Sequence, residues 1–149
     1  MNQPSLEMAK PSDLKAVLEL EQLCFNAEAF TRRQLRYLIS KAKGHFLLSR
    51  KGNQISAFMV LLGKKNSSSM RLYSIAVSPN FRGRGLARHL LTEAAKLVKA
   101  DGFRYIHLEV SEINEAAVKL YLCEGFEVFG ERRAYYKNGS KALLMRKEV

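Results

Sequence analysis

The chain has few cysteines and no long apolar stretch. It contains only two cysteines, Cys24 and Cys123, which lie far from each other and from the histidines. This excludes a disulfide framework and a cysteine-based metal site, so we interpret both as small core residues. No apolar stretch approaches the length of a membrane span, and Met1-Asn2-Gln3-Pro4 lacks the pattern of a signal peptide. We therefore expect a cytoplasmic protein with no membrane partner and no metal.

Length and charge limit the class of protein further. A chain of 149 residues with 47% hydrophobic content can bury a sizeable core, so we expect a single domain over residues 1–149. The formal net charge of +11 favours anionic partners, which include nucleic acid, ribosomal surfaces and a polyphosphate cofactor. The basic residues are scattered and show no nucleic-acid-binding motif, so the charge alone selects none of these partners.

The most informative segment is 73–88, where an apolar strand-like run ends at Pro79, crosses a basic turn and becomes a helix. Gly83 and Gly85 allow a tight bend and a close approach of a ligand to the backbone. The first turn of the helix has amide N–H groups without internal partners and a partial positive charge, so it favours an anion. Three side chains add planar cationic groups that match phosphate oxygens: Arg82, Arg84 and Arg88. The segment therefore predicts a phosphate site.

Two common phosphate motifs do not fit this segment. A Walker A loop needs Lys and then Ser or Thr after its last glycine, whereas Gly85 is followed by Leu86 and Ala87. A dinucleotide fingerprint needs a small residue three positions beyond Gly85, where Arg88 stands. The predicted phosphate site therefore belongs to neither class.

The hydrophobic pattern predicts strands and helices that alternate around a mixed sheet. Strands are expected at 6–8, 45–49, 55–62, 70–77, 105–110, 126–129 and 141–145. Helices are expected from the 11–13 cap to Cys24, from a cap at Thr31 or its neighbour to about Ser40, and over 85–100 and 115–122, the last capped by Asn114. In the strand 105–110, alternation places His107 and Glu109 on one polar face. The fold class is α/β or α+β with a central, partly antiparallel sheet.

The chain resembles the GNAT superfamily of acetyl-CoA-dependent N-acetyltransferases over most of its length. The resemblance rests on segments 75–79, 82–87 and 114–126, with Arg82, Gly85 and Ala87 at the defining positions of a Gln/Arg-x-x-Gly-x-Gly/Ala turn. It implies a mixed, mostly antiparallel sheet flanked by about four helices, and acetyl-CoA as cosubstrate. It also implies a cofactor site made of Ile75, Ala76, Val77, Arg82, Gly83, Arg84, Gly85, Leu86, Ala87, Arg88 and Asn114, in which residues 83–88 supply amides to the pyrophosphate and Ile75 and Val77 contact the pantetheine and acetyl portions.

Within the superfamily, the C-terminal half is most similar to ribosomal-protein-alanine N-acetyltransferases, through Leu108-Glu109-Val110, Asn114, Leu120-Tyr121, Gly125-Phe126 and Tyr135-Tyr136 among others. This resemblance implies that Glu109 is the general base and Tyr121 the general acid. Ser111 and Ile113 stand where those enzymes usually have arginine and serine. The resemblance therefore leaves the acceptor amine open.

The chemistry of acetyl transfer sets demands of its own. Attack on a thioester needs a neutral amine, a path for its proton and an acid for the departing thiolate. A carboxylate with a pKa of ~4.3 is a weak base, so Glu109 needs partial burial or a water relay, in which His107 is either a participant or merely structural. Tyr121, with a pKa of ~10, is protonated and can donate to sulfur. Tyr135 and Tyr136 either shape an acceptor pocket or pack at a strand edge.

The cost of making a neutral amine differs between the candidate acceptors. At pH 7 this cost is ~1 kcal/mol for an N-terminal α-amine but ~4.6 kcal/mol for a lysine. This cost favours an α-amine without excluding a lysine. Together with what the resemblance implies, it leads us to predict direct attack, in a ternary complex, by the N-terminus of a protein such as a ribosomal protein. The alternatives are a lysine or small-molecule amine acetyltransferase, or a non-catalytic CoA-sensing or nucleic-acid-binding module. Nucleic acid is not required for the predicted reaction.

Overall fold

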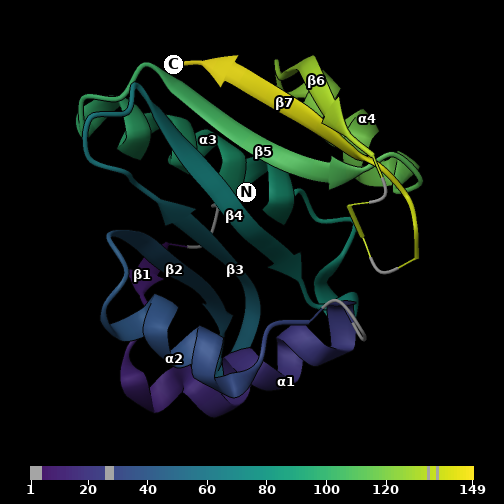
Figure 1. Cartoon of the computed structure of the whole chain (residues 1–149). Coiled ribbons are helices and arrows are strands. Elements are labelled where there is room, and N and C mark those ends of the chain that lie inside the picture. The colour runs from purple at the N-terminus through teal and green to yellow at the C-terminus, as the bar shows by residue number, and fades with distance from the viewer. Residues whose placement is uncertain (1–4, 26–28, 134, 137) are drawn as a thin grey trace.

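The computed structural model describes residues 5–25, 29–133, 135–136 and 138–149. Its strands form a seven-stranded sheet in the order β1-β2-β3-β4-β5-β7-β6 (Figure 1). Their bounds are β1 Leu6–Met8, β2 Gly44–Lys51, β3 Gln54–Leu62, β4 Ser69–Val77, β5 Tyr105–Ser111, β6 Glu127–Arg132 and β7 Ala142–Glu148. Neighbouring strands are antiparallel except β4 and β5, which are parallel.

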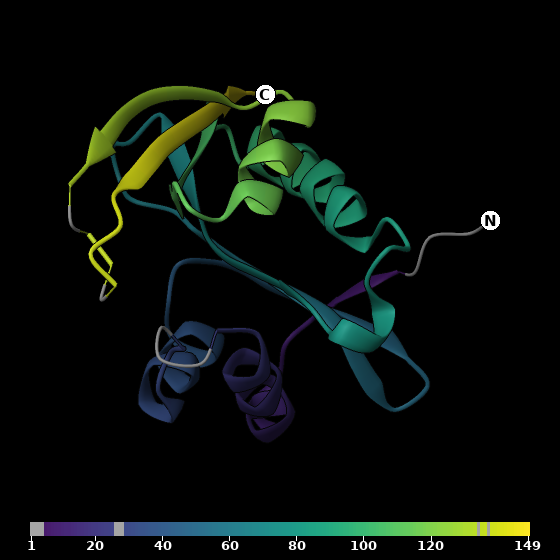
Figure 2. The same ribbon diagram turned by 90° about the vertical axis from the view of Figure 1, so that its right-hand side faces the viewer.

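Four α-helices of the described residues cover the two faces of the sheet. They are α1 Leu14–Phe25, α2 Arg32–Ser40, α3 Leu86–Ala100 and α4 Glu115–Cys123, with short 3-10 turns η1 Pro11–Asp13 and η3 Pro79–Phe81. Figure 2 shows α3 and α4 on one side of the sheet and α1 and α2 on the other. The mixed, mostly antiparallel sheet with four flanking helices confirms the predicted fold class.

The hydrophobic core has two parts, one on each face of the sheet. Ala57, Met59 and Leu61 of β3 pack in the α3 part, while Phe58 and Val60 pack in the α1–α2 part. Because β3 is buried on both faces, its sequence is a continuous apolar run and does not alternate. This explains why the sequence pattern located the strand without revealing which face each residue would cover.

Local capping signals in the sequence form the helix ends that they predict. The Thr31 hydroxyl accepts a hydrogen bond from Gln34 N at 3.2 Å, and the Gln34 side chain accepts one from Thr31 N at 2.8 Å, which completes a capping box. The Asn114 side chain accepts from Ala117 N at 3.2 Å and caps α4. The predicted Asn114 cap is confirmed, and of the two candidates for the other cap, Thr31 or its neighbour, the structure has Thr31.

The parallel pairing of β4 with β5 is short. It covers only residues 69–71 against 105–107, after which β4 continues beside β3 and β5 beside β7 (Figure 1). Tyr73 is an extra residue in β4, because Leu61 pairs with Leu72 and Val60 with Ser74. This bulge reverses the alternation, so that Leu72 before it and Ile75 after it both pack toward the α3 part of the core. The two strands therefore diverge from Arg71 onward.

Cys123 lies exposed at the end of α4, so the prediction that it is a core residue is wrong. Cys24 is half-buried, and its thiol donates a hydrogen bond to the Val77 carbonyl at 3.6 Å. A nine-residue helix with a mixed pattern does not reveal which side it presents to the sheet, which is why the two cysteines could not be told apart.

In the part of the chain that the structure describes, no helix is long and apolar enough to cross a membrane.

Candidate active site

The arginine turn has the backbone that the glycines predict. Gly83 and Gly85 have φ values of 76° and 77°, in the left-handed region that favours glycine. A Cβ built at Gly85 would meet no atom within 4 Å, so the backbone conformation and not crowding requires glycine there. Arg82 does not point freely into solvent, because its Nε donates to the Val77 carbonyl at 3.2 Å. The turn is therefore tied back to the end of β4.

Helix α3 starts at this turn with free amide groups. Its first internal hydrogen bond runs from His89 N to the Gly85 carbonyl at 3.0 Å, so the amides of residues 86–88 have no acceptor within the helix. A cavity of about 380 Å³ opens beside them, lined by Val77, Phe81, Arg82, Gly83, Gly85, Leu86, Ala87, Arg88, Ala116, Ala117 and Leu120. A positive helix end above apolar walls fits a phosphate group joined to an apolar arm.

Two residues of the predicted cofactor site, Arg84 and Ala76, line neither this cavity nor the larger one described next, whereas Ile75 and Asn114 line only the larger one. The Arg84 guanidinium lies 5.3 Å from the centre of the Phe81 ring. Ala76 is buried in the α1–α2 part of the core. A side-chain contact with the cofactor is therefore not expected from either residue, although their backbone groups remain part of the turn and of β4.

A second cavity of about 720 Å³ lies where β4 and β5 diverge. Its wall includes Glu109 and Ser111 of β5, Tyr121 of α4, and the two tyrosines Tyr135 and Tyr136. The two cavities adjoin, because Val77, Ala87, Ala117 and Leu120 line both. The structure thus brings the predicted base, acid and acceptor-pocket residues together at one end of the phosphate site.

Glu109 has the partial burial that the chemistry requires, with 10% of its side chain exposed. Its Oε2 accepts a hydrogen bond from Arg71 Nη2 at 3.2 Å, and its Oε1 lies 3.8 Å from Arg132 Nη1. A hydrogen bond to Glu109 is the largest cause that raises the pKa of the Tyr135 hydroxyl. The carboxylate is therefore held by two cations and one hydroxyl group.

Tyr121 projects from α4 and is only 7% exposed. Its ring packs edge-on against Phe126, with the ring centres 5.5 Å apart. Burial raises the pKa of Tyr121 to about 12, so the hydroxyl keeps its proton at neutral pH and is able to donate it.

Asn114 lines the same cavity. Since its Oδ1 caps α4, a contact with a cofactor would use its NH2 group.

His107 takes a structural position. Its Nδ1 is hydrogen-bonded to the Ser69 hydroxyl, and the residue lines neither cavity. Burial, followed by the charge of Arg71, lowers the pKa of His107. Of the two readings that the sequence left open for His107, the structure supports the structural one.

Two charged residues of the cavity, Glu21 and Arg71, were not found from the sequence. Glu21 of α1 is 1% exposed; its Oε2 accepts from Phe30 N at 2.8 Å, and its Oε1 is buried without a hydrogen-bond partner among the described residues. Burial raises the pKa of Glu21 to about 7. The spacing of Leu14, Val17 and Glu21 on one helix stripe was a readable signal. Arg71, by contrast, joins the site through strand pairing that the sequence does not encode locally.

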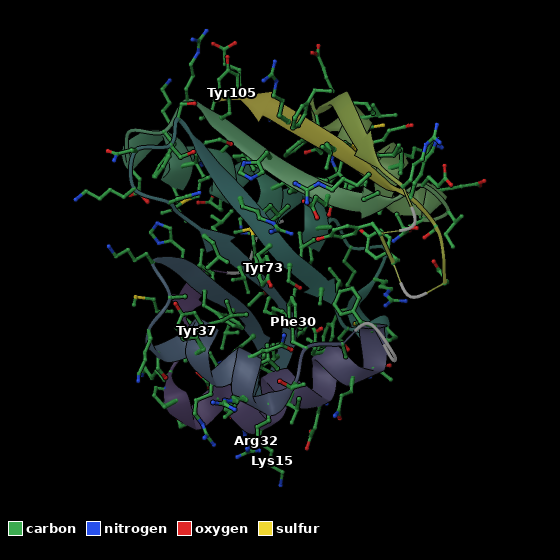
Figure 3. The ribbon with its side chains drawn as sticks, viewed as in Figure 1. Lys15, Phe30, Arg32, Tyr37, Tyr73 and Tyr105 are labelled. Atoms are coloured by element: carbon green, nitrogen blue, oxygen red, sulfur yellow. The ribbon has the colours of Figure 1, made fainter. Side chains whose placement is uncertain are left out.

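Aromatic residues form the wall between α1, α2 and β4. The Phe30 ring stacks on Tyr73 with centres 5.0 Å apart and planes at 11°, and Figure 3 shows the two side chains facing each other. The Arg71 guanidinium lies 4.7 Å from the centre of the same Tyr73 ring. Because Phe30 N–H also donates to Glu21, Phe30 is held by α1 on one side and by Tyr73 of β4 on the other.

The fold and the comparisons with known proteins identify an acetyltransferase that uses acetyl-CoA. The chain belongs to the acetyltransferase (GNAT) family, whose model matches residues 14–126. This confirms the resemblance inferred from the arginine turn and the segments around it, and the prediction of an acetyl-CoA-dependent N-acetyltransferase.

Individual relatives agree with this assignment. The chain is 28% identical to the N-alpha-acetyltransferase RimI of Mycobacterium tuberculosis over 92% of its own length and 87% of that protein. It is also 28% identical to a putative [ribosomal protein bS18]-alanine N-acetyltransferase of Bacillus subtilis, over 89% of this chain and 87% of that one. An uncharacterised Mycobacterium leprae protein is 43% identical over 89 residues, which are 59% of this chain but only 24% of that protein.

A solved structure shows the same fold. The crystal structure of the ribosomal-protein-S18-alanine N-acetyltransferase from Escherichia coli superposes with a TM-score of 0.88 at 24% identity, over 99% of this chain and 94% of that one.

Proposed function

We propose that the protein transfers the acetyl group of acetyl-CoA to the N-terminal α-amine of a protein, such as a ribosomal protein, by direct attack in a ternary complex. The observation that carries this proposal is that Glu109 and Tyr121 line one cavity, which adjoins the cavity at the α3 N-terminus. The names of the relatives with 28% identity support an α-amine as acceptor.

The cosubstrate is placed by the amides of residues 86–88 and the left-handed turn at Gly83 and Gly85. The free helix N-terminus binds the pyrophosphate oxygens, and Val77 and Ala117, which line both cavities, bound the passage from one cavity to the other. The acetyl thioester supplies the electrophilic carbonyl. In this proposal the thioester would lie between the turn and Glu109.

The side chains of the larger cavity perform the proton transfers. Glu109 takes the proton that the amine loses, either directly or through one water molecule. Tyr121 donates its proton to the departing thiolate, for which the raised pKa of about 12 keeps it protonated. The modest basicity of a carboxylate suits an α-amine better than a lysine, because the lysine costs ~4.6 kcal/mol to neutralise at pH 7 and the α-amine ~1 kcal/mol.

The test is acetyl-CoA turnover with peptides that begin with Ala, Ser or Met. Each peptide is paired with a copy whose N-terminus is already blocked and whose lysine is free. We expect turnover with the free N-termini only. Turnover of blocked peptides at the same rate would show a lysine acetyltransferase, and CoA binding without acetylation of any amine would contradict the proposal altogether.

A further inference from the structure

Arg71 is a cation on the wall of the larger cavity. It stands at the last position where β4 pairs with β5, opposite His107, and its Nη2 donates to Glu109 at 3.2 Å. Its Nε is buried and has no hydrogen-bond partner among the described residues. Buried N–H groups in folded proteins nearly always have a partner. The Arg71 side chain as a whole is 34% exposed on the cavity wall, so the exposed part of its guanidinium, and not the buried Nε, is suited to bind an oxygen atom of a ligand.

The charges around Arg71 do not balance. Arg132 lies 3.8 Å from the same Glu109 carboxylate, so two guanidinium groups face one carboxylate. Glu21 is the only other acidic residue on the cavity wall within the described part of the chain. Its burial favours the neutral carboxyl group. Arg132 lies outside the cavity wall, and with Arg71 it gives the surroundings of Glu109 a net positive charge.

The sequence around the cavity reinforces this charge. Residues 29–92 contain no aspartate or glutamate but 13 lysines and arginines, whereas the rest of the chain has 12 basic and 14 acidic residues. The acid-free segment forms α2, β2, β3, β4 and the arginine turn. Arg32, Arg33 and Arg36 of α2 are exposed and form no ion pair within the described residues, and Figure 3 shows Arg32 pointing outward. Such a field attracts acidic molecules toward the site.

We propose that the acceptor is an acidic N-terminal segment, whose second or third residue is an aspartate or glutamate that binds Arg71 and Arg132. The inference rests on the proposed α-amine acetylation and adds which N-termini are acetylated. Arg71 contacts Glu109, where the amine is deprotonated, and an extended peptide advances ~3.4 Å per residue. A carboxylate on the second or third residue is therefore within reach of Arg71 or Arg132.

The position of Arg71 favours a peptide over a nucleic acid. A nucleic acid is bound mainly through a phosphate backbone that runs along an outer surface. Arg71 instead lies in the cavity wall, stacked on Tyr73 and close to Tyr135. A single side-chain carboxylate fits this position.

The experiment compares kcat/KM for three peptides that begin Ala-Glu, Ala-Gln and Ala-Lys and are otherwise identical. We expect the Ala-Glu peptide to exceed the Ala-Lys peptide by about tenfold or more at ~50 mM salt, with Ala-Gln between them. The difference should shrink at ~500 mM salt, because salt screens exposed charges. Equal values for Ala-Glu and Ala-Gln, or a preference for Ala-Lys, would overturn this inference while acetylation itself still supports the proposed function.

Substitutions of single arginines test which of them causes the preference for the Ala-Glu peptide. Arg71→Gln should abolish the preference for Ala-Glu over Ala-Gln, and Arg132→Gln should reduce it, whereas Arg36→Gln, an exposed arginine on α2, should leave it unchanged. If Arg71→Gln loses all activity, Arg132→Gln and the salt dependence of the wild type still decide the question. Retention of the full preference in both variants overturns the inference.

Equal, salt-sensitive inhibition of all three peptides by a single-stranded oligonucleotide, with no preference among them, also overturns it and assigns the basic surface to nucleic acid. If no peptide is acetylated, the inference falls together with the proposed function.

Discussion

Arg71 and Glu109 form an ion pair across the place where β4 and β5 separate, with 3.2 Å between Nη2 and Oε2. The main-chain pairing of the two strands ends at Arg71 and His107, so this side-chain contact continues the link between the strands beyond it. A carboxylate that is held by fixed partners keeps one orientation, which a proton acceptor needs. The pair thus connects the divergence of the strands to the proposed role of Glu109.

Glu109→Gln should lower kcat by about 100-fold or more, because the amide cannot take a proton from the amine. The Gln oxygen can still accept from Arg71, so CoA binding should not change. Steady-state kinetics and CoA titration measure the two effects. Glu112→Gln is the matched control, since Glu112 is exposed and lies three residues along the chain. Wild-type kcat in Glu109→Gln would remove Glu109 from the mechanism.

Tyr121→Phe should lower kcat by about 10- to 100-fold and leave the melting temperature nearly unchanged. The ring that packs against Phe126 remains, and only the hydroxyl, the proposed proton donor to the thiolate, is lost. Tyr37→Phe serves as the control, because Tyr37 is exposed on α2. Full activity of Tyr121→Phe would show that Tyr121 is only a packing residue.

Gly85→Ala should raise the KM for acetyl-CoA. Alanine at a φ of 77° costs about 1 kcal/mol, and its methyl group would stand at the helix end that we propose binds the pyrophosphate. Gly52→Ala is a close control: its φ is 62°, it also has no neighbour within 4 Å, and it lies in the β2–β3 turn. Both variants should lose similar stability in thermal unfolding, but only Gly85→Ala should change the KM. An equal KM in the two variants contradicts the assignment of the turn.

Glu21→Gln should change how stability depends on pH. The native carboxyl keeps its proton up to about pH 7, while the unfolded chain loses it near 4.5. Between these values the native state binds more protons, so the free energy of unfolding of the wild type falls as pH rises. Glutamine retains an oxygen for Phe30 N–H and cannot ionise. The free energy of unfolding of the variant, relative to that of the wild type, should therefore rise from about pH 5 to about pH 8, by up to about 3 kcal/mol.

Urea unfolding at several pH values measures this difference. Glu19→Gln, an exposed position on the same helix, should unfold in parallel with the wild type at every pH. Parallel curves for Glu21→Gln would mean that Glu21 is ionised throughout this range.

The sequence was sufficient where local chemistry decides the structure. Thr31 and Asn114 cap helices through neighbours three residues away, and Gly85 turns the chain by its own backbone. It was insufficient where distant strands meet. The bulge at Tyr73 and the contact of Arg71 with Glu109 depend on the register of β4 against β3 and β5, which no local pattern specifies. Cys123 was misplaced for a similar reason, since the orientation of α4 is set by packing and not by its own sequence.

The most direct test of the α-amine assignment uses one peptide with both a free N-terminus beginning Ala-Glu and an internal lysine. The purified protein and acetyl-CoA are incubated with it, and tandem mass spectrometry locates the added acetyl group. The account predicts acetylation of the N-terminal α-amine, with the lysine unmodified and the product absent in Glu109→Gln. Acetylation of the lysine while the N-terminus stays free would contradict it.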